Sequence, residues 1–140
     1  MQTTALDPPT EPTPAVTSDA MKAIVQDRYG SGEVLELRDI EKPTIGDHDV
    51  LVRVRAAAVN PGDWAIMSAC RTSRVRRLWY GLREPKNPVR GADVAGQVAV
   101  VGVGVTRFRP GDEVFGWCHG AFAEYAAGSE AELSAKPANV

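Results

Sequence analysis

The chain has 140 residues, a mass of 15.0 kDa and a formal net charge of −2, which leaves room for one domain of ordinary size. This near-neutral balance exerts no overall attraction on nucleic acid or on an anionic membrane. No apolar run approaches the roughly 20 residues of a membrane-spanning helix, and two cysteines are too few for a disulfide framework. We therefore expect a cytoplasmic protein with neither nucleic acid nor membrane as its partner.

Residues 1–20 are predicted to be a disordered tail ahead of one domain at residues 21–140. The tail holds four prolines, five threonines and three acids, without lysine, arginine or an aromatic residue. Such a segment cannot bury enough apolar surface to offset the entropy lost on ordering. It has neither the basic start nor the apolar centre of a signal peptide, and Met21 is an alternative start of the protein.

The rest of the chain has the short, mostly two-residue periodicity of β-strands, interrupted by glycine and proline. In the clearest strand, at 50–59, five small or branched apolar residues from Val50 to Ala58 are expected to share one face. Asn60 is a plausible N-cap of a short helix that follows. Together these elements predict a mainly β, partly closed barrel with one or two short helices. The other expected strands are at residues 22–26, from 35 to before Pro43, and at 93–101, 113–117, 121–127 and 133–136.

The segment Arg71–Arg90 differs from the rest, because it carries seven basic residues and one acid. Apolar residues at helical spacing allow a short amphipathic helix within it. It could be a solvated loop, a lid over a substrate cleft, or an RNA-binding segment of interleaved arginines and aromatics. We favour the lid. Its expected contact residues are Arg76, Arg77, Trp79 and Tyr80.

Four segments in order resemble the medium-chain dehydrogenase/reductase superfamily: MKAIV, VLVRVRAAAVNPGDW, GADVAGQVAVVGVGVTRFRPGDEVFG and GAFAEYAA. The resemblance covers essentially residues 21–140 and implies the N-terminal GroES-like barrel, which forms the substrate side of the catalytic cleft. It also implies NADPH or NADH as cofactor, bound mainly by a Rossmann domain that normally follows. We find no strand followed by a glycine-rich phosphate loop in this chain, so that domain is absent from it. Gly102-x-Gly104 lacks a third glycine and is a turn.

The resemblance also implies that zinc is not required. Zinc-dependent members have a cysteine where this chain has Asn60, and a histidine where it has Ala92; a thiolate-containing site cannot form from these two. NPGD is close to the N-P-x-D of the quinone oxidoreductase branch. In that branch the residues matching Asn60 and Asp63 line the cleft. By that analogy Asn60 is a catalytic and cofactor-binding residue that orients the nicotinamide or a carbonyl oxygen, and Asp63 is a catalytic residue that supports its loop.

Each of these signals also has a structural interpretation. Asn60 and Asp63 could be only a helix cap and a first-turn acid. Asp93, in an apolar strand, is expected to pair with an arginine or with the backbone. Cys118-His119 is a weak metal signal, and we expect no metal. A tyrosine and an arginine that follow the N-P-x-D motif in several quinone reductases are replaced here by Ala65 and Met67.

From these observations we expect the N-terminal domain, as a fragment or truncated product, of an NAD(P)H-dependent quinone or enone reductase. The chain alone should be inactive. Its partners would be a small carbonyl or quinone substrate and the missing Rossmann domain, whose docking surface should be exposed; a homodimer is possible. The alternative is a free-standing GroES-like binding module that assembles with itself or with a partner chain and has no activity of its own.

Overall fold

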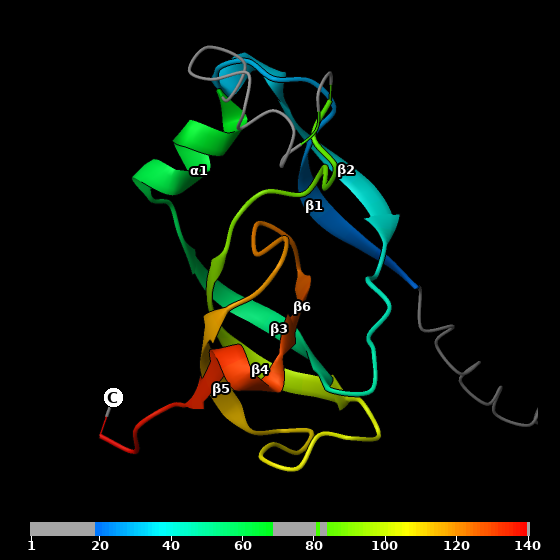
Figure 1. The fold of residues 1–140 in the computed structure, drawn as a ribbon, viewed down its shortest axis with the longest axis vertical. Coiled ribbons are helices and arrows are strands. Elements are labelled where there is room, and N and C mark those ends of the chain that lie inside the picture. The colour runs from blue at the N-terminus through cyan, green and yellow to red at the C-terminus, as the bar shows by residue number, and fades with distance from the viewer. Residues whose placement is uncertain (1–18, 69–80, 82–83, 140) are drawn as a thin grey trace, which may run out of the picture.

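The computed structural model describes residues 19–68, 81 and 84–139. Every strand pair in this part of the chain is antiparallel. The strands form two sheets (Figure 1). One has two strands, β1 (Ala20–Gln26) and β2 (Leu35–Glu41). The other has five, in the order β6 (Tyr125–Ser129), β3 (Asp49–Ala58), β4 (Asp93–Val101), β5 (Glu113–Trp117) and β7 (Leu133–Ala135). Because the larger sheet keeps two unjoined edge strands, the barrel is only partly closed, which confirms the predicted fold class.

The observed elements follow the predicted ones closely, apart from β6. The expected strand at 121–127 starts later, because the amides of Ala121 and Phe122 donate to the carbonyls of Gly91 (3.0 Å) and Arg90 (2.9 Å), outside the strands of the sheet. Three helical elements of the described residues accompany the strands: η1 (Gly32–Val34), α1 (Pro61–Met67) and η3 (Glu130–Glu132).

The core lies inside the curved five-stranded sheet. Fully burying one valine or leucine side chain contributes about 1.5–3 kcal/mol, so this cluster provides most of the stabilisation of the barrel. Its members are Val50, Val52, Val94, Val98, Phe108, Val114, Cys118, Ala121, Ala126 and Leu133.

The face pattern predicted for β3 is confirmed only in its first half. Val50 and Val52 are fully buried and Val54 is half-buried, but Ala56 and Ala58 are exposed. The pairing of β3 with β4 shifts between Val54 and Ala56, which leaves Arg55 without a counterpart. One extra residue in a strand reverses which side chains face the core, so the prediction for the two alanines is wrong.

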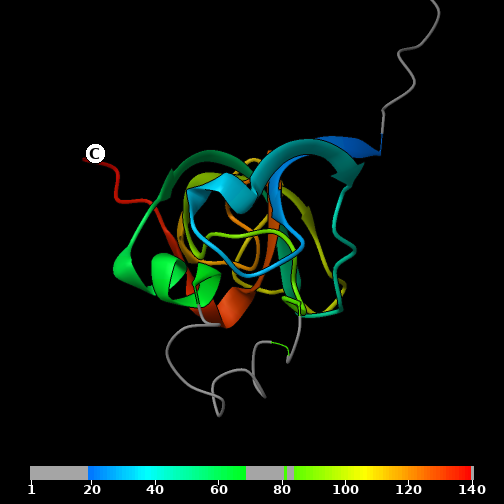
Figure 2. The same cartoon turned by 90° about the horizontal axis from the view of Figure 1, so that it is seen from above.

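The β1-β2 sheet arches over one end of the larger sheet, with α1 beside it (Figure 2). Backbone hydrogen bonds hold it there: the amide of Ile24 donates to the carbonyl of Phe122 and the amide of Gln26 to that of Pro88, both at 2.8 Å. Gln26 is fully buried, and its side-chain amide donates to the carbonyls of Arg28 and Met67 (2.9 Å each). Gln26 thus ties the end of β1 to the end of α1.

In the described residues, the helices are too short or too polar to cross a bilayer.

Candidate functional site

The start of α1 is fixed by a capping box. The Asn60 Oδ1 atom accepts hydrogen bonds from the backbone amides of Gly62 (2.8 Å) and Asp63 (3.3 Å). In return, the backbone amide of Asn60 donates to the Asp63 carboxylate (2.9 Å). Pro61 occupies the first helical position, where its missing N–H is not needed. Asn60 and Asp63 therefore do serve as a helix cap and a first-turn acid, as their structural interpretation expected.

Asn60 makes one further contact, and it reaches a second element. Its side-chain Nδ2 donates to the Asp93 carboxylate at 2.7 Å. The antiparallel register places Asp93 opposite Ala58, two residues before Asn60, which brings the two side chains together. The expected arginine or backbone partner of Asp93 is wrong, because the strand pairing presents this amide instead. Asn60 thereby connects the starts of α1 and β4.

A cavity of about 250 Å³ adjoins this corner, and we call it the Arg90 cavity. Asp63 and Ile66 of α1 line one side of it, Arg90 another, and Trp117 and His119 a third. The rings of Trp117 and His119 contact each other edge to face, with centroids 4.5 Å apart. The cavity is therefore bounded by charged groups on one side and by an aromatic wall on another.

Arg90 is a partly buried charged group of this cavity whose hydrogen bonding is incomplete. Its Nε atom is buried without a hydrogen-bond partner in the described part of the chain. Burial lowers the pKa of the Arg90 guanidinium, and the charge of Asp63 acts in the opposite direction. Sequence reasoning counted Arg90 only as one of several basic residues. Its position directly before Gly91 and the strand that begins at Asp93 is the sequence feature that could have singled it out.

Cys118 of the weak metal signal is fully buried, and Cys70, which that signal also involved, lies outside the described residues. Burial, followed by the negative charge of Glu132, raises the pKa of the Cys118 thiol to about 12, so the thiol is protonated at neutral pH. Cys118 belongs to the core and also lines the Arg90 cavity. In the described residues no group of three or more histidine, cysteine, aspartate or glutamate side chains could hold a metal ion.

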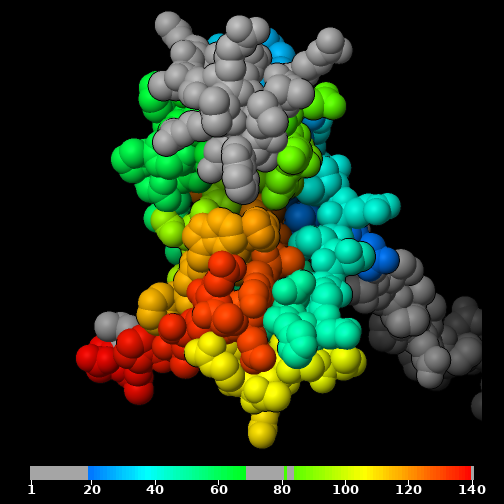
Figure 3. All heavy atoms as spheres, in the orientation of Figure 1, coloured from blue at the N-terminus to red at the C-terminus, as the bar shows by residue number. Residues whose placement is uncertain are grey.

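An exposed apolar face lies next to the Asn60–Asp93 corner. We define it as Ala56, Ala58, Ala95, Phe115 and Trp117, which line one shallow hollow on the outside of β3, β4 and β5. Phe115 and Trp117 remain 44% and 38% exposed. On the same side of the molecule lie α1 and the last described residues of the chain (Figures 1 and 3).

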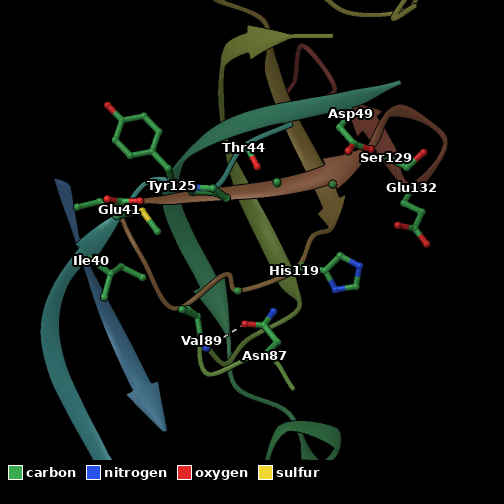
Figure 4. A pocket seen from close by; sticks show the side chains of 15 residues that line it. Ile40, Glu41, Thr44, Asp49, Asn87, Val89, His119, Tyr125, Ser129 and Glu132 are labelled. Carbon is green, nitrogen blue, oxygen red and sulfur yellow. Dashed lines mark hydrogen bonds between the residues drawn. The ribbon is translucent and has the colours of Figure 1, made fainter. Parts of the chain in front are cut away.

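A larger cavity of about 450 Å³ lies between β6 and the segment before β3 (Figure 4). Asp49, Ser129 and Glu132 gather at one end of it, while His119 and Asn87 point in from another side. His119 and Asn87 line both cavities, so the two are neighbours.

The predicted lid residues Arg76, Arg77, Trp79 and Tyr80 lie outside the described residues, as does the predicted amphipathic helix. Of the other predicted site residues, the structure brings Asn60 and Asp63 together.

Comparison with known proteins identifies the family. The sequence profile of the alcohol dehydrogenase GroES-like domain matches residues 46–138. The chain belongs to this family. The GroES-like domain is 39% identical over 113 residues to a quinone oxidoreductase of Lama guanicoe, covering 79% of this chain and 32% of the relative. It is 36% identical over 141 residues to the chloroplastic NADPH-dependent alkenal/one oxidoreductase of Arabidopsis thaliana, covering 89% and 34%.

Solved structures agree with the sequence comparison. The quinone oxidoreductase of Coxiella burnetii superimposes with a TM-score of 0.74 at 28% identity, covering 86% of this GroES-like domain and 38% of that chain. The chain thus spans about a third of the length of the relatives it matches. These findings confirm the resemblance to the quinone oxidoreductase branch of the medium-chain dehydrogenase/reductase superfamily.

Proposed function

We propose that this GroES-like domain forms the substrate side of the hydride-transfer cleft of a zinc-independent, NADPH-dependent reductase of quinones or conjugated carbonyl compounds. The observation that carries the proposal is the Asn60–Asp93 corner. There the side-chain amide of Asn60 donates to the Asp93 carboxylate at 2.7 Å, and the resemblance implies that Asn60 stands where zinc-dependent members of the superfamily have a cysteine. The names of the quinone and alkenal/one oxidoreductases among its relatives support the reaction class.

The residues at this corner do not suit zinc. Protein zinc sites use thiolate, imidazole or carboxylate ligands in a tetrahedral arrangement. Asn60 supplies an amide whose oxygen already accepts two backbone N–H groups, and Ala92 supplies no ligand atom. Asp93 alone remains, and one of its oxygens already accepts from Asn60. We therefore propose a reaction without metal assistance.

Asn60 retains one useful group. A primary amide has two N–H donors and two acceptor positions on oxygen. Both acceptor positions and one N–H are used by the capping box and by Asp93, which leaves one N–H. That donor suits a carbonyl oxygen, either of the nicotinamide carboxamide or of the substrate. Asp63 acts only through Asn60, so it is a positioning residue.

The remaining chemistry belongs to the cofactor. NADPH supplies a hydride when it is bound. The residues of this chain bind and orient the acceptor, and the Trp117–His119 wall excludes water from one side of the cavity. We propose that the exposed apolar face receives a nucleotide-binding domain, because side chains such as Phe115 and Trp117 gain stability when a partner covers them.

A chimera tests the proposed function. The 140-residue chain is joined to the nucleotide-binding domain of the Coxiella burnetii quinone oxidoreductase, and NADPH oxidation is followed with a quinone and with an enone, with and without EDTA. We expect oxidation that depends on the acceptor and is unchanged by EDTA. Asn60→Ala should lower kcat by about 10-fold or more, as loss of a positioned donor does. A folded chimera that binds NADPH but reduces neither acceptor would refute the proposal, as would activity abolished by EDTA.

A second measurement examines the free-standing binding module, which the exposed apolar face also favours. Light scattering after size-exclusion chromatography gives the mass of the 140-residue chain in solution. A stable oligomer that Phe115→Ser dissociates would support self-assembly through this face. A monomer that pairs with the separate nucleotide-binding domain would support the reductase.

A further inference from the structure

We propose that the Arg90 cavity binds a carboxylate on the acceptor, so that the natural substrate is a conjugated carbonyl compound carrying an acidic group. This inference rests on the proposed function, because it assigns a substrate class to the same cleft. The residue concerned is Arg90, which lies outside the Asn60–Asp93 corner. Binding of a carboxylate by Arg90 is tested separately from hydride transfer.

The charges that line the cavity favour an anion. Arg90 and Lys86 contribute two positive charges, and Asp63 contributes one negative charge. One Asp63 oxygen is already engaged by the backbone amide of Asn60. None of the ion pairs in the described residues involves Arg90 or Lys86. The cavity therefore holds a cationic excess that the described part of the protein does not neutralise.

Arg90 also has unused hydrogen-bonding capacity. Guanidinium presents five N–H donors in a planar fork that matches a carboxylate. The Nε–H group is buried away from water and no described residue accepts its hydrogen bond. Because this atom is closed to water-sized groups, a carboxylate bound in the cavity would accept from the terminal N–H groups of the same guanidinium fork. Burial lowers the pKa of Arg90, the direction expected for a cation that has lost part of its hydration.

The size and position of the cavity limit the ligand. A volume of about 250 Å³ corresponds to roughly eight water molecules in the liquid, which suits a small acid rather than a nucleotide. Asp63 lines the cavity and also holds Asn60. A carboxylate held at Arg90 would thus keep the other end of a short acceptor near the Asn60–Asp93 corner, while Trp117 and His119 contact its apolar part.

Nuclear magnetic resonance on the ¹⁵N-labelled 140-residue chain tests this inference, because a buried Arg Nε–H gives its own signal. The probes are 4-oxopentanoate, which is a saturated and unreactive product analogue, and its neutral methyl ester. We expect the acid to shift the Arg90 Nε–H signal and to bind at least 10-fold more tightly than the ester. Charge-assisted hydrogen bonds of this kind change affinity about 10- to 100-fold. Sulfate at equal ionic strength should bind at least 10-fold more weakly than the acid.

Arg90→Gln should weaken binding of the acid about 10-fold or more and leave ester binding unchanged. The matched control is Arg109→Gln, which removes the same charge from the loop between β4 and β5, at the opposite end of the molecule from α1 (Figure 1). Arg90→Lys keeps the charge without the fork and should give an intermediate loss. The comparison of acid with ester on the unchanged chain remains informative even if a variant fails to fold.

Equal affinity for acid and ester, absence of binding by both, equal binding of sulfate, or full binding by a folded Arg90→Gln variant would each overturn the inference. The chimera separates this result from the proposed function. Acceptor reduction without a preference for the acid would refute only the carboxylate site. Acid binding at Arg90 with an inactive chimera would refute only the reductase.

Discussion

The hydrogen bond between Asn60 and Asp93 gives the sharpest test of the site geometry, through the substitution Asn60→Asp. The new carboxylate still offers oxygens to the amides of Gly62 and Asp63, so the helix cap is kept. It cannot donate to Asp93, and it places a second negative charge where the Asn60 Nδ2 atom now lies 2.7 Å from an Asp93 oxygen. A favourable contact becomes a repulsive one without a change in side-chain size.

The expected loss is small but measurable. Asp93 is exposed, so the repulsion takes its value in water, about 1 kcal/mol at 4 Å. Loss of the hydrogen bond adds roughly 0.5–1.5 kcal/mol. The free energy of unfolding should therefore fall by about 1.5–2.5 kcal/mol at pH 7. The repulsive part should shrink in 1 M salt, because the Debye length is then only about 3 Å.

Urea denaturation followed by tryptophan fluorescence measures this change. The double variant Asn60→Asp/Asp93→Asn supplies the control, because it exchanges donor and acceptor and allows the same hydrogen bond with reversed polarity. It should recover most of the lost stability. A single variant as stable as the unchanged chain, or a double variant in which the two losses simply add, would show that this contact does not hold the corner together in solution.

Three further predictions concern residues that shape the site. Gly91→Ala should destabilise the fold by more than 1 kcal/mol in the same urea assay, because Gly91 has a φ of 90° and its added Cβ would lie 2.6 Å from the Phe122 ring; an unchanged midpoint would contradict this close approach. In a Cys70→Ser variant, Cys118 should resist iodoacetamide at pH 8 until the chain unfolds, and stability should fall as pH rises from about 9 towards 12, since burial raises the thiol pKa to about 12. Rapid labelling of Cys118 in this native variant would argue against burial. Gln26→Leu should cost about 1–3 kcal/mol, because the carbonyls of Arg28 and Met67 each lose the hydrogen bond that the Gln26 side chain donates, and Met67 keeps only the one from the Gly30 amide. Equal stability would mean that water replaces these hydrogen bonds.

The sequence predicted most of the fold because alternation and turn residues are local signals. The order and nearly all bounds of the strands followed from them, and so did the helix after Asn60. The exposed alanines at the end of β3 could not be foreseen, because a register shift depends on the partner strand. Local patterns contain no information about which residues oppose each other.

The candidate site also combines features that local sequence signals predict with features that depend on distant residues. Asn60 and Asp63 were found by their position in a motif and by their capping chemistry, both of which are short-range. Their link to Asp93 depends on the pairing of residues 58 and 93, which a single sequence does not show. Arg90 was concealed in a run of basic residues, because burial rather than residue type distinguishes it from its neighbours.

The position of β1 has a consequence for how the chain folds. The backbone amide of Lys22 donates to the Glu124 side chain, and the amide of Glu124 donates to the Lys22 carbonyl, across 102 residues of sequence. Contacts of such long sequence separation form late, because the loop-closure entropy must be overcome first. During synthesis on the ribosome, β1 and β2 must therefore wait until about residue 124 has emerged before they reach their final place. The buried side chains of Met21, Ala23 and Val25 are exposed to water and to other chains throughout that interval.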